Sequence, residues 1–237
     1  GFEAMEIIFD GPENPLFAHD TAQEIKTLAR SAGISVSSVC AEYSMFNPLF
    51  GQTQKKSLEV ILKLIQRCAE IDIPRVGISF EDNSAIHSKT QIDQAILSMK
   101  ECMSMAEQLN MIVTIETSLY GSNLREFINR VGSSSLKINF DTGNSCTNGD
   151  DVPAAIRGFG SLIGGIHIKD RTRLFGSTIR LGDGDVDFQS CFRAMKKIGY
   201  SGPLIIQGAR GDDDIQTAQS YLEFVRKHLY AVENDND

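Results

Sequence analysis

Four apolar runs in this chain each lead to a polar side chain that can bind a metal ion. The four side chains are Glu116, Asp141, His167 and Gln207. Glutamate, aspartate and histidine supply the usual oxygen and nitrogen ligands of divalent cations, whereas glutamine is an uncommon ligand. If the runs are neighbouring parallel strands, their carboxyl ends meet at one end of a sheet. The spacing therefore predicts an active site there, with Gln207 as its exception.

Strand alternation supports this interpretation, because residues two positions apart in a strand share one face. The pairs that share a face are Thr114 with Glu116, Asn139 with Asp141, and Gly165 with His167. Polar or small residues on one face are what a polar pocket requires. A single acid at a strand end is often only a helix cap or a turn former. Four coincident strand ends favour a site.

The elements that must position these residues follow a strand, loop, helix rhythm. Strands are expected at residues 4–9, 35–41, 75–80, 111–116, 136–141, 163–169 and 203–207. Helical spacing of apolar residues predicts helices at 21–32, 55–70, 92–106, 124–131, 152–157, 188–198 and 218–229. This alternation predicts βαβ units and a parallel sheet.

The expected fold class is α/β, and an eight-fold (β/α)8 TIM barrel is the closest standard architecture. Seven strand–helix units are visible, so the barrel would lack its first unit in this chain. No linker or shift in composition interrupts residues 1–237, which predicts one domain.

Composition excludes several classes of function. The net charge of −8 argues against nucleic acid as the main partner, since phosphate backbones attract basic surfaces. No apolar stretch approaches the roughly 20 residues that span a membrane, and a cytoplasmic location is expected. Five scattered cysteines are expected to be buried small hydrophobes. His19, His87 and His228 are expected at the surface.

Longer motifs carry a resemblance to a known family. They are Ile115-Glu116-Thr117, Asn139-Phe140-Asp141-Thr142-Gly143-Asn144, His167-Ile168-Lys169-Asp170-Arg171, residues 181–188 (LGDGDVDF) and residues 199–206 (GYSGPLII). In this order they resemble the xylose isomerase-like TIM-barrel family of sugar and sugar-phosphate isomerases and epimerases. The resemblance covers nearly the whole chain from residue 4 onward.

The resemblance implies one divalent metal ion (Mn, Zn, Co or Mg) held at the four strand ends. It assigns ligand roles to Glu116, Asp141 and His167, with Gln207 where the family has a second glutamate. In the epimerases of this family, the first and last glutamates also move protons. The implied function is a metal-dependent sugar or sugar-phosphate isomerase or epimerase.

The expected chemistry removes a proton beside a carbonyl group and forms an enediolate. A metal ion stabilises the negative charge, and a carboxylate takes the proton. Glu116 can serve as that base, but the amide of Gln207 cannot accept a proton near pH 7. A two-base epimerisation is therefore doubtful, whereas a one-base aldose–ketose isomerisation is compatible.

Basic residues near two of the strand ends predict an anionic substrate. Arginine forks match phosphate oxygens, which suggests a phosphorylated or nucleotide-linked sugar. A solvated loop with no such role is the alternative. The expected substrate-binding residues are Asn144, Lys169, Arg171, Arg180, Arg210 and Glu42.

Other functions remain open at this point. Because Gln207 replaces an expected glutamate, the protein could be a non-catalytic or degenerate sugar-binding barrel. A dehydratase on the same scaffold is a further alternative. A nuclease resembling endonuclease IV would need several more histidines than this chain has. The expected partner is a small sugar or sugar phosphate, with neither nucleic acid nor membrane, and the chain could form a homo-oligomer.

Overall fold

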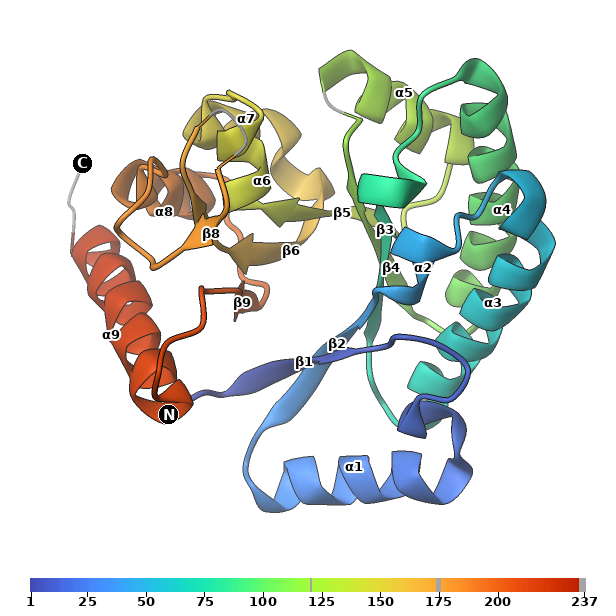
Figure 1. The fold of residues 1–237 in the computed structure, drawn as a ribbon, viewed down its shortest axis with the longest axis horizontal. Helices are drawn as coiled ribbons and strands as arrows, with labels where there is room; N and C mark the ends of the chain where they lie inside the picture. The colour runs from blue at the N-terminus through green and yellow to red at the C-terminus, as the bar shows by residue number, and fades with distance from the viewer. Residues whose placement is uncertain (120, 174–175, 235–237) are drawn as a thin grey trace. The chain divides into compact units, whose positions relative to one another are not determined.

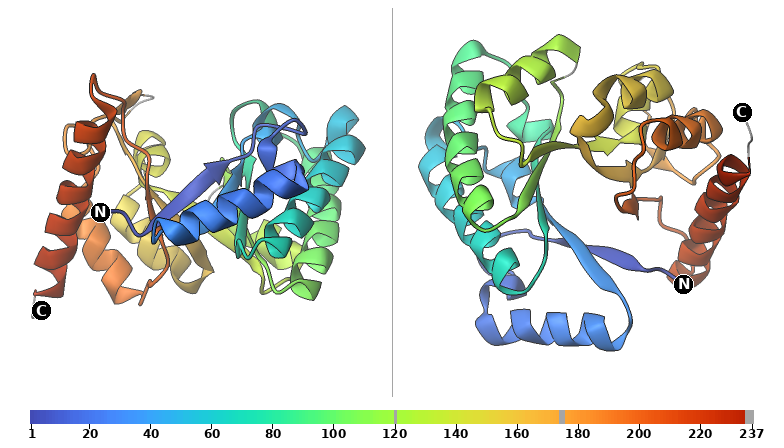
Figure 2. Two further views of the ribbon diagram at one scale, coloured as in Figure 1. Left: turned by 90° about the horizontal axis from the view of Figure 1, so that it is seen from below. Right: turned by 180° about the vertical axis from the view of Figure 1, so that it is seen from behind.

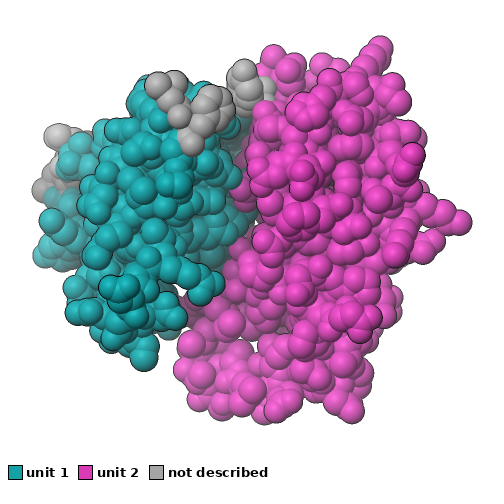
Figure 3. Space-filling model, in the orientation of Figure 1, with its two compact units in different colours: residues 1–2, 139–237 teal, residues 3–138 magenta. Residues whose placement is uncertain are grey.

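The computed structural model describes residues 1–119, 121–173 and 176–234. The chain folds into two compact units (Figure 3). The N-terminal unit comprises residues 3–138, and the C-terminal unit comprises residues 1–2 and 139–237. Every helix within the described ranges is too short or too polar to span a bilayer. The predictions of a single domain and of a missing first strand–helix unit stay predictions.

The strands form a parallel sheet in which sequence order is also spatial order. The N-terminal unit contains β1 (Ala4–Ile8), β2 (Ser35–Ala41), β3 (Arg75–Phe80), β4 (Ile112–Thr117) and the first half of β5 (Leu136–Asp141). The second half of β5 continues into the C-terminal unit, where β6 (Ile163–Ile168) and β9 (Leu204–Ile206) follow. The described residues thus contain the seven predicted strands, and parallel pairing is confirmed.

Helices follow the strands as the apolar periodicity predicts (Figures 1 and 2). The main helices are α1 (His19–Ser31), α3 (Gln54–Glu70), α4 (Lys89–Gln108), α5 (Gly121–Val131), α7 (Val152–Phe159), α8 (Phe188–Lys197) and α9 (Asp214–Glu233). Within the N-terminal unit, α3 packs beside α4, and α4 packs beside α5. Within the C-terminal unit, α8 packs beside both α7 and α9.

Strands β3 and β4 show how the sheet separates core from site. One face carries Val76, Ile78, Val113 and Ile115, which are buried hydrophobic residues. The opposite face carries the cross-strand pairs Gly77 with Thr114 and Ser79 with Glu116. Because neighbouring residues of a strand point to opposite faces, the apolar face packs in the core while the other face stays small or polar.

Short elements were missed by the sequence patterns. Within the described ranges they are α2 (Tyr43–Phe46), α6 (Thr142–Thr147) and the antiparallel pair β7 (Asp170–Arg171) and β8 (Thr178–Ile179), together with four 3₁₀ turns. Elements of two to six residues span too few positions for a period to emerge. Of these, α6 directly follows Asp141 at the end of β5, and β7 begins just after Lys169.

Two predictions concern individual side chains. Four of the five cysteines are buried, as expected of small hydrophobes. Burial raises the pKa of the Cys68 and Cys102 thiols to about 12. His228 is partly exposed, and its ring centroid lies 4.4 Å from that of Phe224 while the ring stacks on Phe192. Phe224 lies on the same helix, α9, whereas Phe192 comes from α8, so the sequence of α9 alone does not show the stacking.

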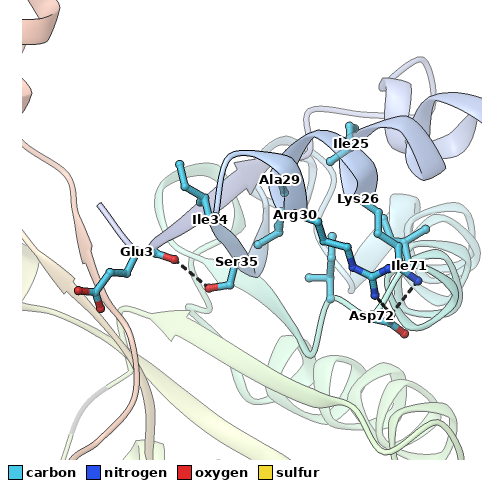
Figure 4. Close-up of a pocket in the computed structure, with 12 residues that line it drawn as sticks. Glu3, Ile25, Lys26, Ala29, Arg30, Ile34, Ser35, Ile71 and Asp72 are labelled. Carbon is cyan, nitrogen blue, oxygen red and sulfur yellow. Dashed lines mark hydrogen bonds and ion pairs between the residues drawn. The ribbon is translucent and has the colours of Figure 1, made fainter. Parts of the chain in front are cut away.

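A cavity of about 360 Å³ lies in the N-terminal unit at the amino ends of β1 and β2 (Figure 4). At its rim, Asp72 accepts contacts from Lys26 Nζ at 2.7 Å and from an Arg30 guanidinium nitrogen at 3.3 Å. These charges satisfy one another. Glu116 lies at the opposite, carboxyl end of the same parallel sheet, so this cavity is not the predicted site.

The cap of α8 gives a stability test. The Asp187 carboxylate accepts the Ser190 N–H at 3.0 Å, and hydrogen bonds from Ser190 hold the pKa of Asp187 below its usual value. A lowered carboxyl pKa stabilises the fold above the unfolded-state pKa, and this stability is lost as pH falls through the folded-state pKa. Asp187→Ala should lower the free energy of unfolding by about 1 kcal/mol at pH 7, as measured by urea denaturation.

The difference between wild type and Asp187→Ala should shrink when the same titration is repeated near pH 3. Asp183→Ala is the control, because Asp183 is an exposed acid in the preceding loop and should change stability by less than about 0.5 kcal/mol. A difference that stays constant between the two pH values would contradict the charged-cap interpretation.

Candidate functional site

Asp141 ends β5 and begins α6. Its Oδ1 accepts the Asn144 N–H at 2.7 Å, which caps the short helix. Its Oδ2 lies 3.4 Å from Lys169 Nζ and 4.0 Å from His167 Nδ1. The Asp141 side chain is only 1% exposed. A buried carboxylate is costly unless charge and hydrogen bonds compensate it, and these contacts supply that compensation.

His167 lies on β6, the strand next to β5, with its side chain 1% exposed. Asn139, two residues before Asp141 on β5, places its Nδ2 3.0 Å from His167 Nε2 and 3.3 Å from Nδ1. An amide beside an imidazole donates to an unprotonated ring nitrogen or, after a flip, accepts from a protonated one. In either case the Asn139 amide orients the His167 ring.

Gly165 makes room for this contact. A Cβ atom at position 165 would lie 2.5 Å from Asn139 Oδ1. Because real atoms do not approach so closely, any larger residue on this face of β6 would displace the Asn139 amide. The shared face of Gly165 and His167, expected from alternation, is thus occupied by a side chain of the neighbouring strand.

Lys169 and Gln207 meet beyond the ends of β6 and β9. Lys169 Nζ donates to the side-chain oxygen Oε1 of Gln207 at 3.4 Å, while the backbone N–H of Gln207 donates to the Ile168 carbonyl at 2.9 Å. The Lys169 backbone is fixed by Thr142, whose hydroxyl accepts the Lys169 N–H at 3.0 Å and donates to its carbonyl at 2.7 Å. One ammonium group therefore bridges the carboxylate of Asp141 and the amide of Gln207.

Arg171 and Asn144 form a second polar contact in the C-terminal unit. Arg171 Nη1 donates to Asn144 Oδ1 at 2.9 Å, and Nε donates to the Gly176 carbonyl at 2.7 Å. Asn144 is the residue whose N–H is bound by Asp141. Lys169, Arg171 and Asn144, which the sequence grouped as substrate-binding candidates, therefore all connect to Asp141 directly or through one neighbour.

The remaining candidates are Arg180, Arg210, Glu42 and Glu116. Arg180 and Arg210 are exposed, and the charge of Arg180 acts on Tyr221, whose hydroxyl donates to the Ala209 carbonyl at 2.7 Å. Burial raises the pKa of Tyr221, and the Arg180 charge opposes that rise. Glu42 and Glu116 belong to the N-terminal unit, where Glu42 precedes α2 and Glu116 lies near the end of β4.

Asp170 is a polar residue to which the sequence patterns assigned no role. It is fully buried, and its carboxylate accepts backbone N–H groups from Gly182, Gly184 and Val186. Burial raises its pKa, and the hydrogen bonds from Gly184 and Gly182 oppose that rise. Its place between Lys169 and Arg171, followed by a glycine-rich loop, was the available signal.

Comparison with known proteins identifies the family. A profile of the xylose isomerase-like TIM barrel matches residues 1–228. The chain belongs to this family. The resemblance stated from the motifs is confirmed, and so is the fold class.

Relatives and solved structures agree with the family assignment at low identity. L-ribulose-5-phosphate 3-epimerase UlaE of Salmonella paratyphi C is 24% identical over 224 residues, which cover 87% of this chain and 78% of the relative. The xylose isomerase domain protein of Planctomyces limnophilus has a TM-score of 0.86 at 20% identity, covering 98% of this chain and 90% of that one. An L-ribulose 3-epimerase has a TM-score of 0.81 at 16% identity, with 98% and 86% covered.

The donor set in the C-terminal unit fits a divalent cation. Asp141 and His167 present an oxygen and a nitrogen from adjacent strands, both nearly inaccessible to solvent. Gln207 adds a neutral amide oxygen that already contacts Lys169. Ring orientation by Asn139 is the type of support that metal-binding histidines receive. Because Gln207 is neutral, this set carries one negative charge fewer than a set with glutamate at that position.

Gly165→Ala tests the packing that orients His167. The added methyl should displace Asn139 and lower the free energy of unfolding by about 1–3 kcal/mol, measured by urea denaturation. In an Asn139→Ala background the same substitution should cost less, because the colliding amide is gone. Gly158→Ala is the matched control: a Cβ there meets no atom within 4 Å, and it should be neutral or stabilising. An equal penalty in both backgrounds would refute the contact.

Proposed function

We propose that this protein is a metal-dependent isomerase or epimerase that acts on a sugar or a sugar phosphate. The observation that carries the proposal is the buried Asp141–His167 pair, with Lys169 and Gln207 beside it at the strand ends. Membership in the xylose isomerase-like family and the named activities of the matched relatives support the same reaction class.

Asp141, His167 and Gln207 are the proposed ligands from the C-terminal unit, and Glu116 is the proposed fourth. Glu116, Asp141 and His167 are the group of potential ligands found among the described residues. Strand register supports including Glu116: Thr114 pairs with Lys137 and Ile115 with Ile138. Because side chains alternate along a strand, Glu116 shares a face of β4 with Thr114, as Asp141 shares a face of β5 with Asn139.

Glu116 is the proposed base that removes the proton beside the substrate carbonyl. A bound divalent ion would polarise that carbonyl as a Lewis acid and stabilise the negative charge that develops. Gln207 can hold a substrate or metal oxygen in place but cannot move a proton. A single carboxylate that removes and returns the proton on one face suits an aldose–ketose isomerisation better than a two-base epimerisation.

Lys169, Arg171 and Asn144 are the proposed contacts to substrate oxygens. Lys169 carries a positive charge beside Asp141 and Gln207, and two of the five guanidinium N–H groups of Arg171 serve the contacts to Asn144 and Gly176. The other guanidinium N–H groups of Arg171 are donors that suit hydroxyl or phosphate oxygens. Arg180, Arg210 and Glu42 are further proposed substrate-binding residues.

A degenerate, sugar-binding barrel is the second candidate, and one observation favours it. The side chain at position 207 is an amide held by Lys169, so this strand end supplies no proton-transfer group. In that case the protein would bind a sugar without turnover. A dehydratase is the third candidate function, and its product would have lost one water molecule relative to the substrate.

Solvent deuterium exchange distinguishes these functions. With L-ribulose 5-phosphate and with L-ribulose in D₂O, the metal-loaded wild type should incorporate deuterium beside the carbonyl, as detected by NMR. Glu116→Gln should slow this by at least about 10²-fold, because the base is removed. Glu223→Gln, an exposed acid on α9, is the control and should retain the rate. Faster exchange with the phosphorylated sugar would support the phosphate role of the basic residues.

Each outcome points to one function. Exchange that appears only after Gln207→Glu would make the natural protein a degenerate enzyme. Loss of water from the sugar without exchange would instead favour the dehydratase. No exchange in wild type or in Gln207→Glu, together with measurable sugar binding, would leave the binding barrel.

Metal binding gives an independent test. Wild type should bind one Mn²⁺ ion per chain, measured by isothermal titration and metal analysis, and His167→Ala should lose this binding. Gln207→Glu should tighten binding by about tenfold or more, since it adds a negative charge to the ligand set. Gln189→Glu adds the same charge at an exposed position of α8 and should leave affinity unchanged. No Mn²⁺, Zn²⁺ or Co²⁺ binding by wild type would rule out the metal enzyme.

A further inference from the structure

Asp170 gathers three backbone N–H groups from one loop onto a single carboxylate. Its Oδ2 accepts the Gly182 N–H at 2.8 Å and the Gly184 N–H at 3.0 Å, and its Oδ1 lies 3.4 Å from the Val186 nitrogen. Asp170 is 0% exposed. The loop from 181 to 186 therefore folds around a buried carboxylate that belongs to the segment following His167.

The loop backbone lies directly against that carboxylate. A Cβ atom at Gly184 would collide with Asp170 Oδ1. Only glycine lets the chain come this close while its N–H points at an acceptor. The contact is thus built into two separate stretches of sequence, the motif at 167–171 and the glycine-rich motif at 181–188.

Further hydrogen bonds tie the same loop to both sides of Asp170. The Asp185 N–H donates to the Arg171 carbonyl at 3.1 Å, and Asp185 Oδ2 accepts the Arg173 N–H at 2.8 Å. Asp170 and Arg171 also pair with Ile179 and Thr178 in the β7–β8 ribbon. The loop and the strand that it braces form one hydrogen-bonded piece.

The residues on either side of Asp170 face the candidate site. Lys169 reaches Asp141 and Gln207, and Arg171 reaches Asn144. Side chains alternate along an extended segment, so an inward anchor at 170 fixes the direction of both neighbours. Asp170, which takes no part in the proposed chemistry, thereby fixes the direction of Lys169 and Arg171, the two cations that are proposed to contact the substrate.

We propose that Asp170 is a positioning residue that locks the 181–186 loop onto β7 and so aims Lys169 and Arg171 at Asp141, Gln207 and Asn144. Its importance for turnover rests on the proposed function. The structural part of the proposal stands separately, because it concerns only the backbone of the C-terminal unit.

Hydrogen exchange at backbone amides tests the structural part without any substrate. In wild type, the Gly182 and Gly184 amides should be protected. In Asp170→Ala, their exchange should accelerate by at least about tenfold, because the acceptor is removed. Asp170→Asn keeps one carbonyl oxygen and should lie between the two.

Two further amides separate positioning from simple loss of an acceptor. The Asp185 amide is bound by the Arg171 carbonyl, and the Lys169 amide is bound by Thr142 Oγ1. Neither acceptor is removed in Asp170→Ala. Faster exchange at both amides, with α8 and α9 core amides unchanged, supports the proposal. Unchanged exchange at Lys169 and Asp185 overturns it, as does protection that persists at Gly182 and Gly184.

Asp183→Ala is the matched control, because it removes an exposed acid from the same loop and should leave all of these amides as in wild type. With L-ribulose 5-phosphate as the probe, Asp170→Ala should raise KM by about tenfold while kcat changes less. Asp170→Asn should recover part of that loss. An unchanged KM, despite faster exchange, would overturn the link to the site. Failure of wild type to act on any sugar would instead count against the proposed function and leave the exchange result to decide the positioning role.

Discussion

Asp141 divides its two carboxylate oxygens between the fold and the candidate site. Oδ1 accepts the Asn144 N–H and so caps α6, whereas Oδ2 faces Lys169 and His167. A carboxylate with a 1% exposed side chain would cost several kcal/mol if it lacked such partners. The groups that face Oδ2 come from β6 and from the segment after it, so strand register and site geometry are set together. Displacing β6 by one residue would turn His167 and its neighbours to the other face.

Backbone approach is the second constraint, and it depends on glycine at two positions. Gly165 leaves space for the Asn139 amide beside His167, and Gly184 lets a loop amide reach Asp170. At both positions glycine gives up the packing of a larger side chain so that a polar group can come close. This loss is tolerated only where each buried polar group finds a hydrogen-bond partner. Asn139 and Asp170 are not candidate ligands, but they help to hold the polar residues of the site in place: Asn139 through the His167 ring, and Asp170 through the loop backbone.

Much of the fold could be predicted because the strands are dense apolar runs and the helices carry a clear period. The same apolar runs predicted strand ends at Asp141, which ends β5, and at Gln207, which lies just beyond β9. The site was harder to predict. Arg171 and Asn144 were grouped only as substrate contacts, and their contact with each other depends on α6 and β7, which are too short to show a pattern. The ring contacts of His228 could not be predicted because its phenylalanine neighbours come partly from α8.

The sequence by itself determined the chemical kinds available at the strand ends, including the amide at position 207 in place of a carboxylate. That is a matter of composition and spacing, which no folding step changes. Only the tertiary structure decided which groups compensate one another: Lys169 between Asp141 and Gln207, and Asp170 turned away to hold a distant loop. Such pairings join residues 12 to 38 positions apart. They depend on strand register and loop closure, which bring together residues that are far apart in the sequence.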